Sequence, residues 1–139
     1  MSCSKHAPKM KIDIHKSDTD GDIITLLEDF AVTWKTKTFT VPAGFNSDGV
    51  STPRFLWATI SPAVDPRTIR AGVAHDYLYR IQPDGWSRAE ADKIFFDFIR
   101  EDGLRFMPSL KAYLGLRLFG GLAWRENQEL AARQTPEAQ

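Results

Sequence analysis

The sequence predicts an α+β protein in which a small N-terminal antiparallel β-meander packs on a C-terminal bundle of about three helices. Strand-like residues fill 10–41, helical periodicity with capping signals fills 65–133, and a turn-rich segment, 42–61, lies between them. With 139 residues, of which 42% are hydrophobic, the chain is expected to fold as a single domain, 1–139, without a disulfide or a metal ion.

Short strands are expected in the first part of the chain, after a loose N-terminal arm at residues 1–9. Each strand is indicated either by alternation of apolar and polar residues or by its β-branched and aromatic content. An Asp-rich stretch at 17–22 predicts a turn, and the pair Glu28–Asp29 predicts a bend. The strands are predicted at residues 10–15, 23–27, 30–34 and 39–41.

Residues 42–61 are predicted to form a functional loop and a short helix. The stretch from Pro42 to Gly49 is dense in turn formers, and Ser51–Pro53 has the capping residue and the proline of a helix start. A connection of this length is uncommon in a compact domain and is usually functional or disordered. Its aromatic residues favour order.

Helix signals dominate the rest of the chain. Asp65 is expected to cap the first helix, with Pro66 at its first position, and Ser87 with Glu90 forms a capping box for the second. A glycine after each of the first two helical patterns favours their termination. The helices are predicted at residues 65–82, 87–102 and 108–133, followed by a frayed tail at 134–139.

Glycines mark the face of the third helix that is expected to contact another helix. Gly115, Gly120 and Gly121 lie on or near one face. Glycine has no Cβ atom, so a neighbouring helix can approach closely at such positions, at some cost in intrinsic helicity. A close contact between helices is therefore predicted along this face.

The composition excludes several classes of protein. Lys plus Arg and Asp plus Glu both number 18, so the net charge is zero, which argues against a nucleic-acid partner. No run of apolar residues is long enough for a transmembrane segment, and the N-terminus lacks the apolar stretch of a signal peptide. The single cysteine, Cys3, cannot form an internal disulfide, and no Cys and His cluster has the spacing of a zinc site.

His75 and Asp92 are the leading candidates for a chemical site. Each is a polar residue on the apolar stripe of its helix, and a buried carboxylate needs a partner. A short connection joins the two helices, so we expect an antiparallel hairpin with both side chains at similar heights. A hydrogen bond between them would fix the imidazole tautomer and leave the other nitrogen as a general base. Catalysis also requires that this nitrogen face an open groove.

The same residues have a structural interpretation. A buried His–Asp pair is often only a tie between two helices. Tyr79 either orients the ring of His75 or is a core tyrosine that hydrogen-bonds to Asp92. Arg88, one turn before Asp92, is a further candidate at this place.

Asp76 suggests a cation site beside His75. The two residues are turned about 100° from each other on the helix, and a hard cation such as calcium suits a carboxylate together with loop carbonyls. The other ligands are expected from the loop that contains Asn46, Asp48 and Gly49. Alternatively, Asp48 is only the turn residue that its neighbour Gly49 suggests.

Two further loop residues have two interpretations each. Ser51 is either a helix cap or a nucleophile, and the absence of nucleophile-elbow glycines favours the cap. Arg54 either pairs with a buried carboxylate or clamps an anion. Both residues are kept as candidate residues of the loop.

Several blocks between residues 39 and 124 match a known pattern. They read Phe39–Phe45, Ser47–Arg54, Ala74–Tyr79, Ser87–Phe95 and Arg117–Trp124. Together they resemble the phage and prophage family named domain of unknown function 1353. The loop of that family usually reads closer to Thr-Asp-Phe-Ala-Ser-x-Pro, from which this loop departs mildly. The resemblance implies a phage or prophage origin, and the family's name assigns no activity.

A second resemblance concerns the two helices alone. The pattern His75-Asp76-x-x-Tyr79, with Asp92 on the next helix, is similar to the catalytic helix pair of secretory phospholipase A(2). The similarity implies that His75 activates water and that Asp76 binds calcium. It also implies that Tyr79 and Asp92 orient the ring. Leu78 stands where that group has a half-cystine, and its glycine-rich calcium loop is not recognisable here.

Three hypotheses about function follow. The first is a small phage-encoded hydrolase, with or without calcium, that uses His75 as its base on an ester or amide of the bacterial envelope. The second is a non-catalytic virion, assembly or lysis-associated component that contacts phage structural proteins. The third is an inhibitor of a host protein. The expected location is the cytoplasm of the infected host or the virion, and the sequence predicts no oligomeric state.

Overall fold

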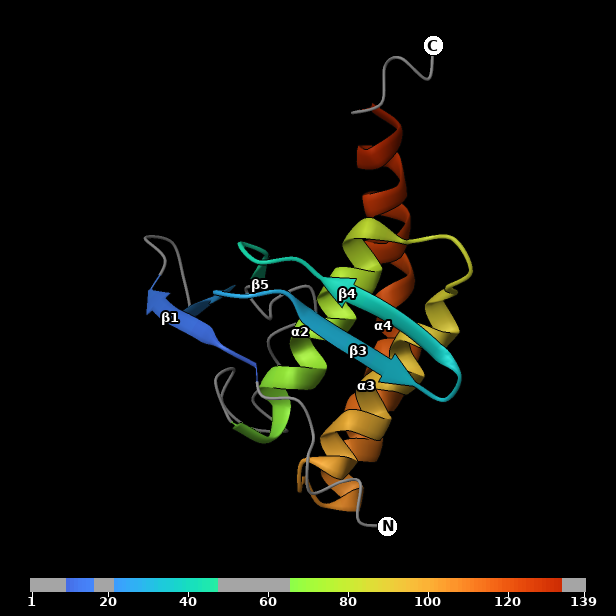
Figure 1. Ribbon diagram of the computed structural model, residues 1–139. Coiled ribbons are helices and arrows are strands. Elements are labelled where there is room, and N and C mark those ends of the chain that lie inside the picture. Colours follow the sequence, from blue (N-terminus) through green and yellow to red (C-terminus); the bar gives the residue numbers. More distant parts are fainter. Residues whose placement is uncertain (1–9, 17–21, 48–65, 134–139) are drawn as a thin grey trace. The chain divides into compact units, whose positions relative to one another are not determined.

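The computed structural model describes residues 10–16, 22–47 and 66–133 (Figure 1). The chain divides into two compact units, residues 1–48 with the strands and residues 49–139 with the helices. Antiparallel strands followed by helices confirm the predicted α+β class. Folding as a single domain, with the strands packed on the helices, remains a prediction. The predicted short helix after Ser51 and the predicted cap Asp65 lie outside the described residues.

The described strands of the N-terminal unit form two antiparallel sheets. They are β1 (Ile12–Lys16), β2 (Asp22–Leu26), β3 (Phe30–Trp34), β4 (Lys37–Val41) and β5 (Asn46–Ser47). One sheet has the order β1-β2-β5, and β3 pairs with β4 in the other. Ile24 of β2 lies opposite Ile14 of β1 and opposite Ser47 of β5, which fixes the register of the larger sheet.

The strands differ from a simple meander in one respect. β2 pairs with β5 rather than with β3, so the two hairpins belong to separate sheets. Leu26 accepts a backbone hydrogen bond from Gly44 (2.8 Å) and donates one to Phe45 (3.0 Å). Gly44 has φ +89°, a conformation that favours glycine, in the turn that leads into β5. A strand of two residues has no detectable periodicity, so the sequence did not reveal β5 within the predicted functional loop.

Alternation in β3 and β4 separates a buried face from an exposed face. In β3 every second residue is buried, and the intervening Ala31 and Thr33 are exposed. Bulky side chains at every second position give a paired strand one apolar face. The buried side chains of this hairpin are Phe30, Val32, Trp34, Phe39 and Val41.

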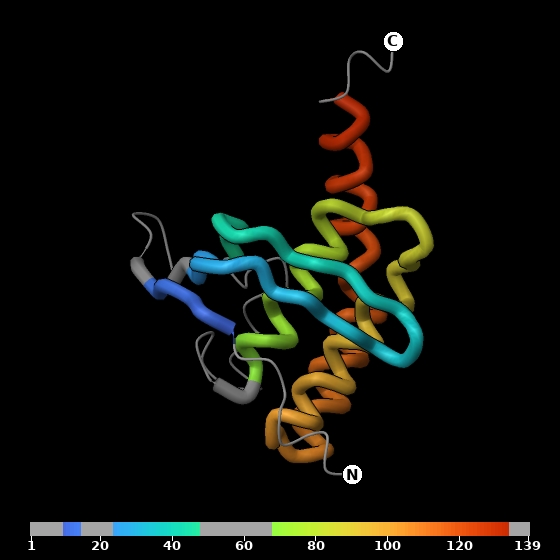
Figure 2. The backbone as a smooth tube through the Cα atoms, viewed as in Figure 1, coloured from blue at the N-terminus to red at the C-terminus, as the bar shows by residue number. Residues whose placement is uncertain are grey.

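The helices of the C-terminal unit follow one another with short connections. They are α2 (Pro66–Ile81), α3 (Arg88–Glu101) and α4 (Phe106–Arg133). The tube in Figure 2 reverses direction between α2 and α3, where Gln82 (φ +49°) and Gly85 (φ +88°) lie in the connection. α2 packs on α3, and α4 packs on both. The predicted α2–α3 hairpin is confirmed.

Local capping sets the ends of α3. The backbone N–H of Glu90 donates to Ser87 Oγ (3.2 Å), and the N–H of Ser87 donates to the Glu90 carboxylate (3.0 Å). These two bonds are the predicted capping box. At the other end Gly103 has φ +107°, which ends the helix as expected.

α4 begins at Phe106, slightly before the predicted start at Pro108. Pro108 therefore falls in the first turn, where a helix does not need the missing N–H. α4 is longer than the other two helices, and its C-terminal part extends beyond them (Figure 1). No described helix is both long and apolar enough to cross a membrane.

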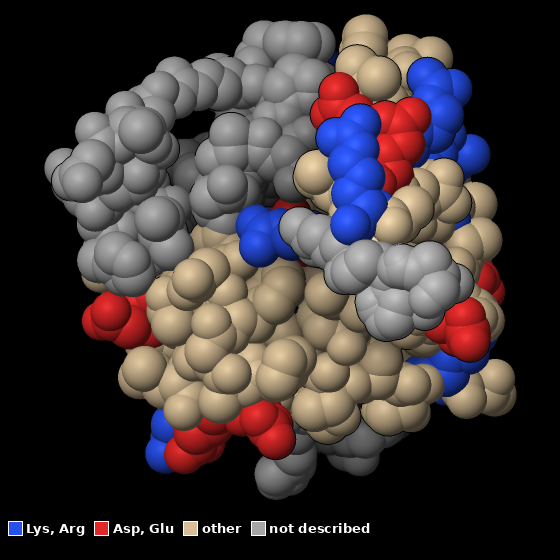
Figure 3. Space-filling model, turned by 90° about the horizontal axis from the view of Figure 1, so that it is seen from above, with Lys and Arg blue, Asp and Glu red and all other residues tan. Residues whose placement is uncertain are grey.

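Surface charge follows the balanced composition. On the face shown in Figure 3, basic and acidic side chains lie close to one another and are interspersed with uncharged surface.

The core of the helical unit encloses ionisable groups. His75, Asp76 and Asp92 are buried among apolar side chains such as Leu78 and Phe95. Buried ionisable groups of this kind mark a candidate functional site.

Candidate functional site

Asp92 is the centre of the candidate site. It lies on the buried face of α3 and has no exposed surface. Its carboxylate accepts hydrogen bonds from two side chains of α2, and arginines of α3 and α4 point their guanidinium groups at it. The donors are Tyr79 Oη (2.6 Å), Arg117 Nη1 (2.8 Å), His75 Nε2 (3.0 Å) and Arg88 Nη1 (3.4 Å).

The hydrogen bond predicted between His75 and Asp92 is present. Nε2 of the imidazole contacts Oδ1 of Asp92 at 3.0 Å. Because an ionised carboxylate only accepts, Nε2 of the neutral ring carries the proton and Nδ1 keeps the lone pair. Nδ1 has no hydrogen-bond partner among the residues that the structure describes.

Aromatic rings hold the imidazole in place. The ring of Tyr79 lies 4.2 Å from that of His75, centroid to centroid, and the ring of Phe95 lies 5.4 Å away in an edge-on arrangement. His75 is only 4% exposed as a result. The open groove expected at the second nitrogen remains a prediction.

Burial and charge act in opposite directions on Asp92. Burial alone would raise the pKa of the carboxyl, but the hydrogen bond and the positive charge of protonated His75, together with hydrogen bonds from Tyr79 and Arg117, outweigh it and lower the pKa below its usual range. Burial, and then the neighbouring charge of Asp92, raise the pKa of the Tyr79 hydroxyl. Asp92 is therefore the ionised acceptor and Tyr79 the protonated donor of this 2.6 Å bond.

The sequence did not single out Arg117, which makes one of the shortest contacts with Asp92. Its guanidinium comes from α4 and is one-third exposed, whereas Asp92 is fully buried. Arg88 also donates to two backbone oxygens of α4, those of Leu116 (3.1 Å) and Arg117 (3.4 Å). The available signal was indirect: a buried carboxylate needs donors, and the glycines of α4 predicted its close approach.

Gly120 explains how α4 comes so near. A Cβ atom at this position would overlap Tyr79 Oη and would lie 3.2 Å from Arg88 Nη1. At Gly121 the added atom would meet Arg88 at ordinary contact distances of 3.9 and 4.0 Å. The close helix contact predicted from the glycines is therefore confirmed, and Gly120 is the position that requires it.

Only part of the predicted cation site lies within the described residues. Asp76 is buried and faces Arg80, one turn later, at 3.3 Å. Asp48 lies outside the described residues. The described part of the chain contains no cluster of three potential ligands among its His, Cys, Asp and Glu residues. The calcium site therefore remains a prediction.

The other predicted loop residues lie in the N-terminal unit or outside the described residues. Asn46 lies in β5, where its side-chain oxygen accepts a hydrogen bond from Thr25 (2.6 Å). Gly49, Ser51 and Arg54 lie outside the described residues. The structure therefore joins His75, Tyr79, Arg88 and Asp92, and adds Arg117 to them.

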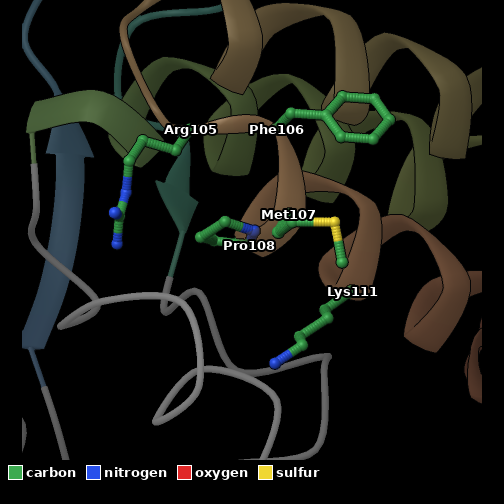
Figure 4. Close-up of a pocket in the computed structure, with 5 residues that line it drawn as sticks. All are labelled: Arg105, Phe106, Met107, Pro108 and Lys111. Carbon is green, nitrogen blue, oxygen red and sulfur yellow. The ribbon is translucent and has the colours of Figure 1, made fainter.

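A separate cavity of about 480 Å³ lies at the start of α4 (Figure 4). Arg105 and Phe106 extend to opposite sides, and Lys111 extends away from the helix below Met107. The lining combines apolar side chains with two basic side chains, and it shares no residue with the Asp92 cluster. The lining residues are Arg105, Phe106, Met107, Pro108 and Lys111.

The chain was compared with known protein families, curated proteins and solved structures. A sequence model of the family described as "Protein of unknown function (DUF1353)" matches residues 24–116. The chain belongs to this family. The DUF1353 match runs from β2 into α4 and includes His75, Tyr79 and Asp92, but it ends one residue before Arg117. Searches of curated proteins and of solved structures gave no match.

Proposed function

We propose that this DUF1353 protein is a small hydrolase, encoded by a phage or prophage, in which His75 is the general base. The observation that carries the proposal is the hydrogen bond from His75 Nε2 to the buried, ionised Asp92, which leaves the lone pair on Nδ1 in the neutral form of the ring. An ester or amide of the bacterial envelope is the proposed substrate class, and the phage origin rests on the family resemblance.

The proposed chemistry needs no group beyond water and the substrate. Nδ1 of His75 takes a proton from a water molecule, whose oxygen attacks the carbonyl carbon of the ester or amide. The imidazolium then returns the proton to the leaving oxygen or nitrogen as the bond to carbon breaks. Asp92 stabilises the imidazolium, because its negative charge lies 3.0 Å from the opposite ring nitrogen.

The remaining residues position the dyad. Tyr79 and Arg117 hold the two carboxylate oxygens of Asp92, so the carboxylate cannot rotate away from the ring. Arg88 ties α3 to the backbone of α4 at the same level. These three are positioning residues, and the proposed step does not use calcium, because Asp76 forms an ion pair with Arg80.

A second candidate function has its own supporting observation. His75 is only 4% exposed, and Asp92 is fully buried with four donors, as in a structural tie. On this alternative the protein is a non-catalytic virion or lysis-associated component, and the cluster only holds three helices together. The proposed location for either function is the infected cytoplasm or the virion.

Hydrolysis assays with a conservative variant test the proposal. We expect the wild-type protein to hydrolyse at least one of p-nitrophenyl butyrate, phospholipid vesicles or purified peptidoglycan, with and without added calcium. His75→Gln keeps a donor toward Asp92 but has no basic nitrogen, so it should lose activity roughly a hundredfold or more. Its melting temperature should stay close to that of the wild type.

The control is Asp97→Asn on the same helix, whose carboxylate lies 3.4 Å from Lys93 Nζ and is more exposed than that of Asp92. It should leave both activity and melting temperature unchanged. Equal activity in wild type and His75→Gln would reject His75 as the base. No hydrolysis of any of the three substrates, combined with strong destabilisation by His75→Gln, would favour the structural alternative.

A further inference from the structure

The outward face of α4 carries apolar residues that no other described helix covers. Leu118 is 75% exposed, Leu122 is 59% exposed and Leu114 is 48% exposed. Single exposed leucines are common, but several in one contiguous row mark an interaction surface. Leu118 and Leu122 are four residues apart and therefore lie on one side of the helix.

Charges of opposite sign lie at the two ends of this row. Lys111 and Glu129 are both exposed. They are separated by 18 positions, which at about 100° per residue is a whole number of turns. Leu118 and Leu122 lie within roughly 20° of the same line. We call these four residues, Lys111, Leu118, Leu122 and Glu129, the outer stripe of α4.

The outer stripe of one α4 helix is complementary to the outer stripe of a second α4 helix that runs antiparallel to it. The midpoint between Lys111 and Glu129 is position 120, and the midpoint between Leu118 and Leu122 is also position 120. In an antiparallel pair of α4 helices with a two-fold axis at that level, Lys111 of each copy faces Glu129 of the other. Leu118 of each copy likewise faces Leu122 of the other. Such a reciprocal arrangement is the signature of an isologous interface.

We propose that a second copy of this chain docks antiparallel on the outer stripe of α4 and forms a symmetric dimer. The leucines supply the buried apolar centre, and the two Lys–Glu pairs at the ends select the antiparallel orientation. A parallel pair would instead place Lys111 against Lys111 and Glu129 against Glu129, which is repulsive. The proposal does not depend on the hydrolase activity proposed above.

The observations favour a protein partner over a membrane surface. An interfacial membrane helix has a polar face rich in Lys and Arg beside its apolar face. Here the charged residues that follow Leu122 are Arg125, Glu126 and Glu129, so this end of the helix is of mixed sign, and an anionic lipid surface would repel the two glutamates. A palindromic placement of charges has no role in membrane binding.

Charge reversal tests the orientation directly. Sedimentation velocity of the full chain over a wide range of concentrations should show a dimer whose fraction rises with concentration. Lys111→Glu should raise the dissociation constant roughly tenfold, because both end pairs become repulsive. Glu129→Lys should do the same. Mixing the two variants, or combining both changes in one chain, should restore association to within roughly threefold of the wild type.

An apolar substitution tests the centre of the interface. Leu118→Glu should abolish the dimer, whereas Leu130→Glu, an equally drastic change at a leucine that lies off the stripe and is 47% exposed, should not. Circular dichroism melting checks that each variant is folded. Because these positions are exposed, no loss of the fold is expected.

Defined outcomes overturn the proposal. A wild-type chain that is monomeric at all concentrations excludes the dimer. A dimer that survives Leu118→Glu excludes this surface, and charge-reversed variants that do not recover on mixing exclude the antiparallel register. A monomer that instead sediments with vesicles of phosphatidylglycerol, in a manner abolished by Leu118→Glu, would assign the face to membrane binding.

Discussion

At the scale of single residues, Asp92 decides the character of the helical core. A carboxylate with no exposed surface would normally become protonated, but here four donors from three helices surround it. Removing the charge leaves those donors partly unsatisfied, and the two arginines then lie beside one another without a counter-ion. The same carboxylate thus serves stability and, on our proposal, orientation of the His75 ring.

Asp92→Asn is therefore expected to destabilise the protein by about 3 kcal/mol, because it leaves the buried Tyr79 hydroxyl and two partly buried guanidinium groups without their ionic acceptor. Urea unfolding followed by circular dichroism measures the free energy of unfolding. The matched control, Asp97→Asn on the more exposed side of α3, should change it by less than about 0.5 kcal/mol. Equal stability of both variants would show that the Asp92 charge contributes nothing.

At the scale of secondary-structure elements, the packing of α4 depends on an absent side chain. Gly120 lets Tyr79 Oη and the Arg88 guanidinium lie directly against the α4 backbone. Tyr79 cannot easily move aside, because its ring also packs edge-on against Trp124 (5.1 Å) and its hydroxyl bonds to Asp92. The helix accepts lower intrinsic helicity at this position in exchange for the close contact.

Two neighbouring glycines allow a direct comparison. Gly120→Ala should destabilise the protein by roughly 1–3 kcal/mol, because its methyl group overlaps Tyr79. Gly121→Ala meets only ordinary contacts, so the gain in helix propensity should stabilise the protein by about 0.5–1 kcal/mol. Thermal melts of the two variants measure the difference. Equal shifts of the same sign would contradict the close approach at Gly120.

At the scale of the whole molecule, stability is expected to depend on pH through the same cluster. The pKa of Asp92 is lower in the folded protein than in the unfolded chain, so the unfolded chain binds the proton first as the pH falls. The stabilisation is fully present above the ordinary pKa of about 4 and is lost as the pH drops below it, through the lowered folded value.

Melting temperatures between neutral pH and strongly acidic pH measure this effect. The wild-type melting temperature should fall more steeply below about pH 4 than that of Asp92→Asn, which has no proton to gain at this position. Parallel curves for the two proteins would mean that Asp92 has the same pKa folded and unfolded.

Much of the fold was predictable because it depends on local signals. Period-two alternation, the Ser87–Glu90 capping box and the glycine after α3 are short-range features, and the structure reproduces each of them. The His75–Asp92 contact was predictable for a similar reason, since a short connection fixes the relative height of two helices. The pairing of β2 with β5 and the contact of Arg117 with Asp92 depend on residues far apart in the chain.

The sequence by itself determined the α+β class, the ends of α3 and the polar residues that needed partners inside an apolar stripe. Only the tertiary structure decided which partners they found. Arg117 reaches Asp92 because Gly120 removes the steric barrier between α4 and Tyr79, and no local pattern reports that distance. Local hydrogen bonds depend on residues that are close in the sequence, whereas the neutralisation of a buried charge depends on how whole helices pack.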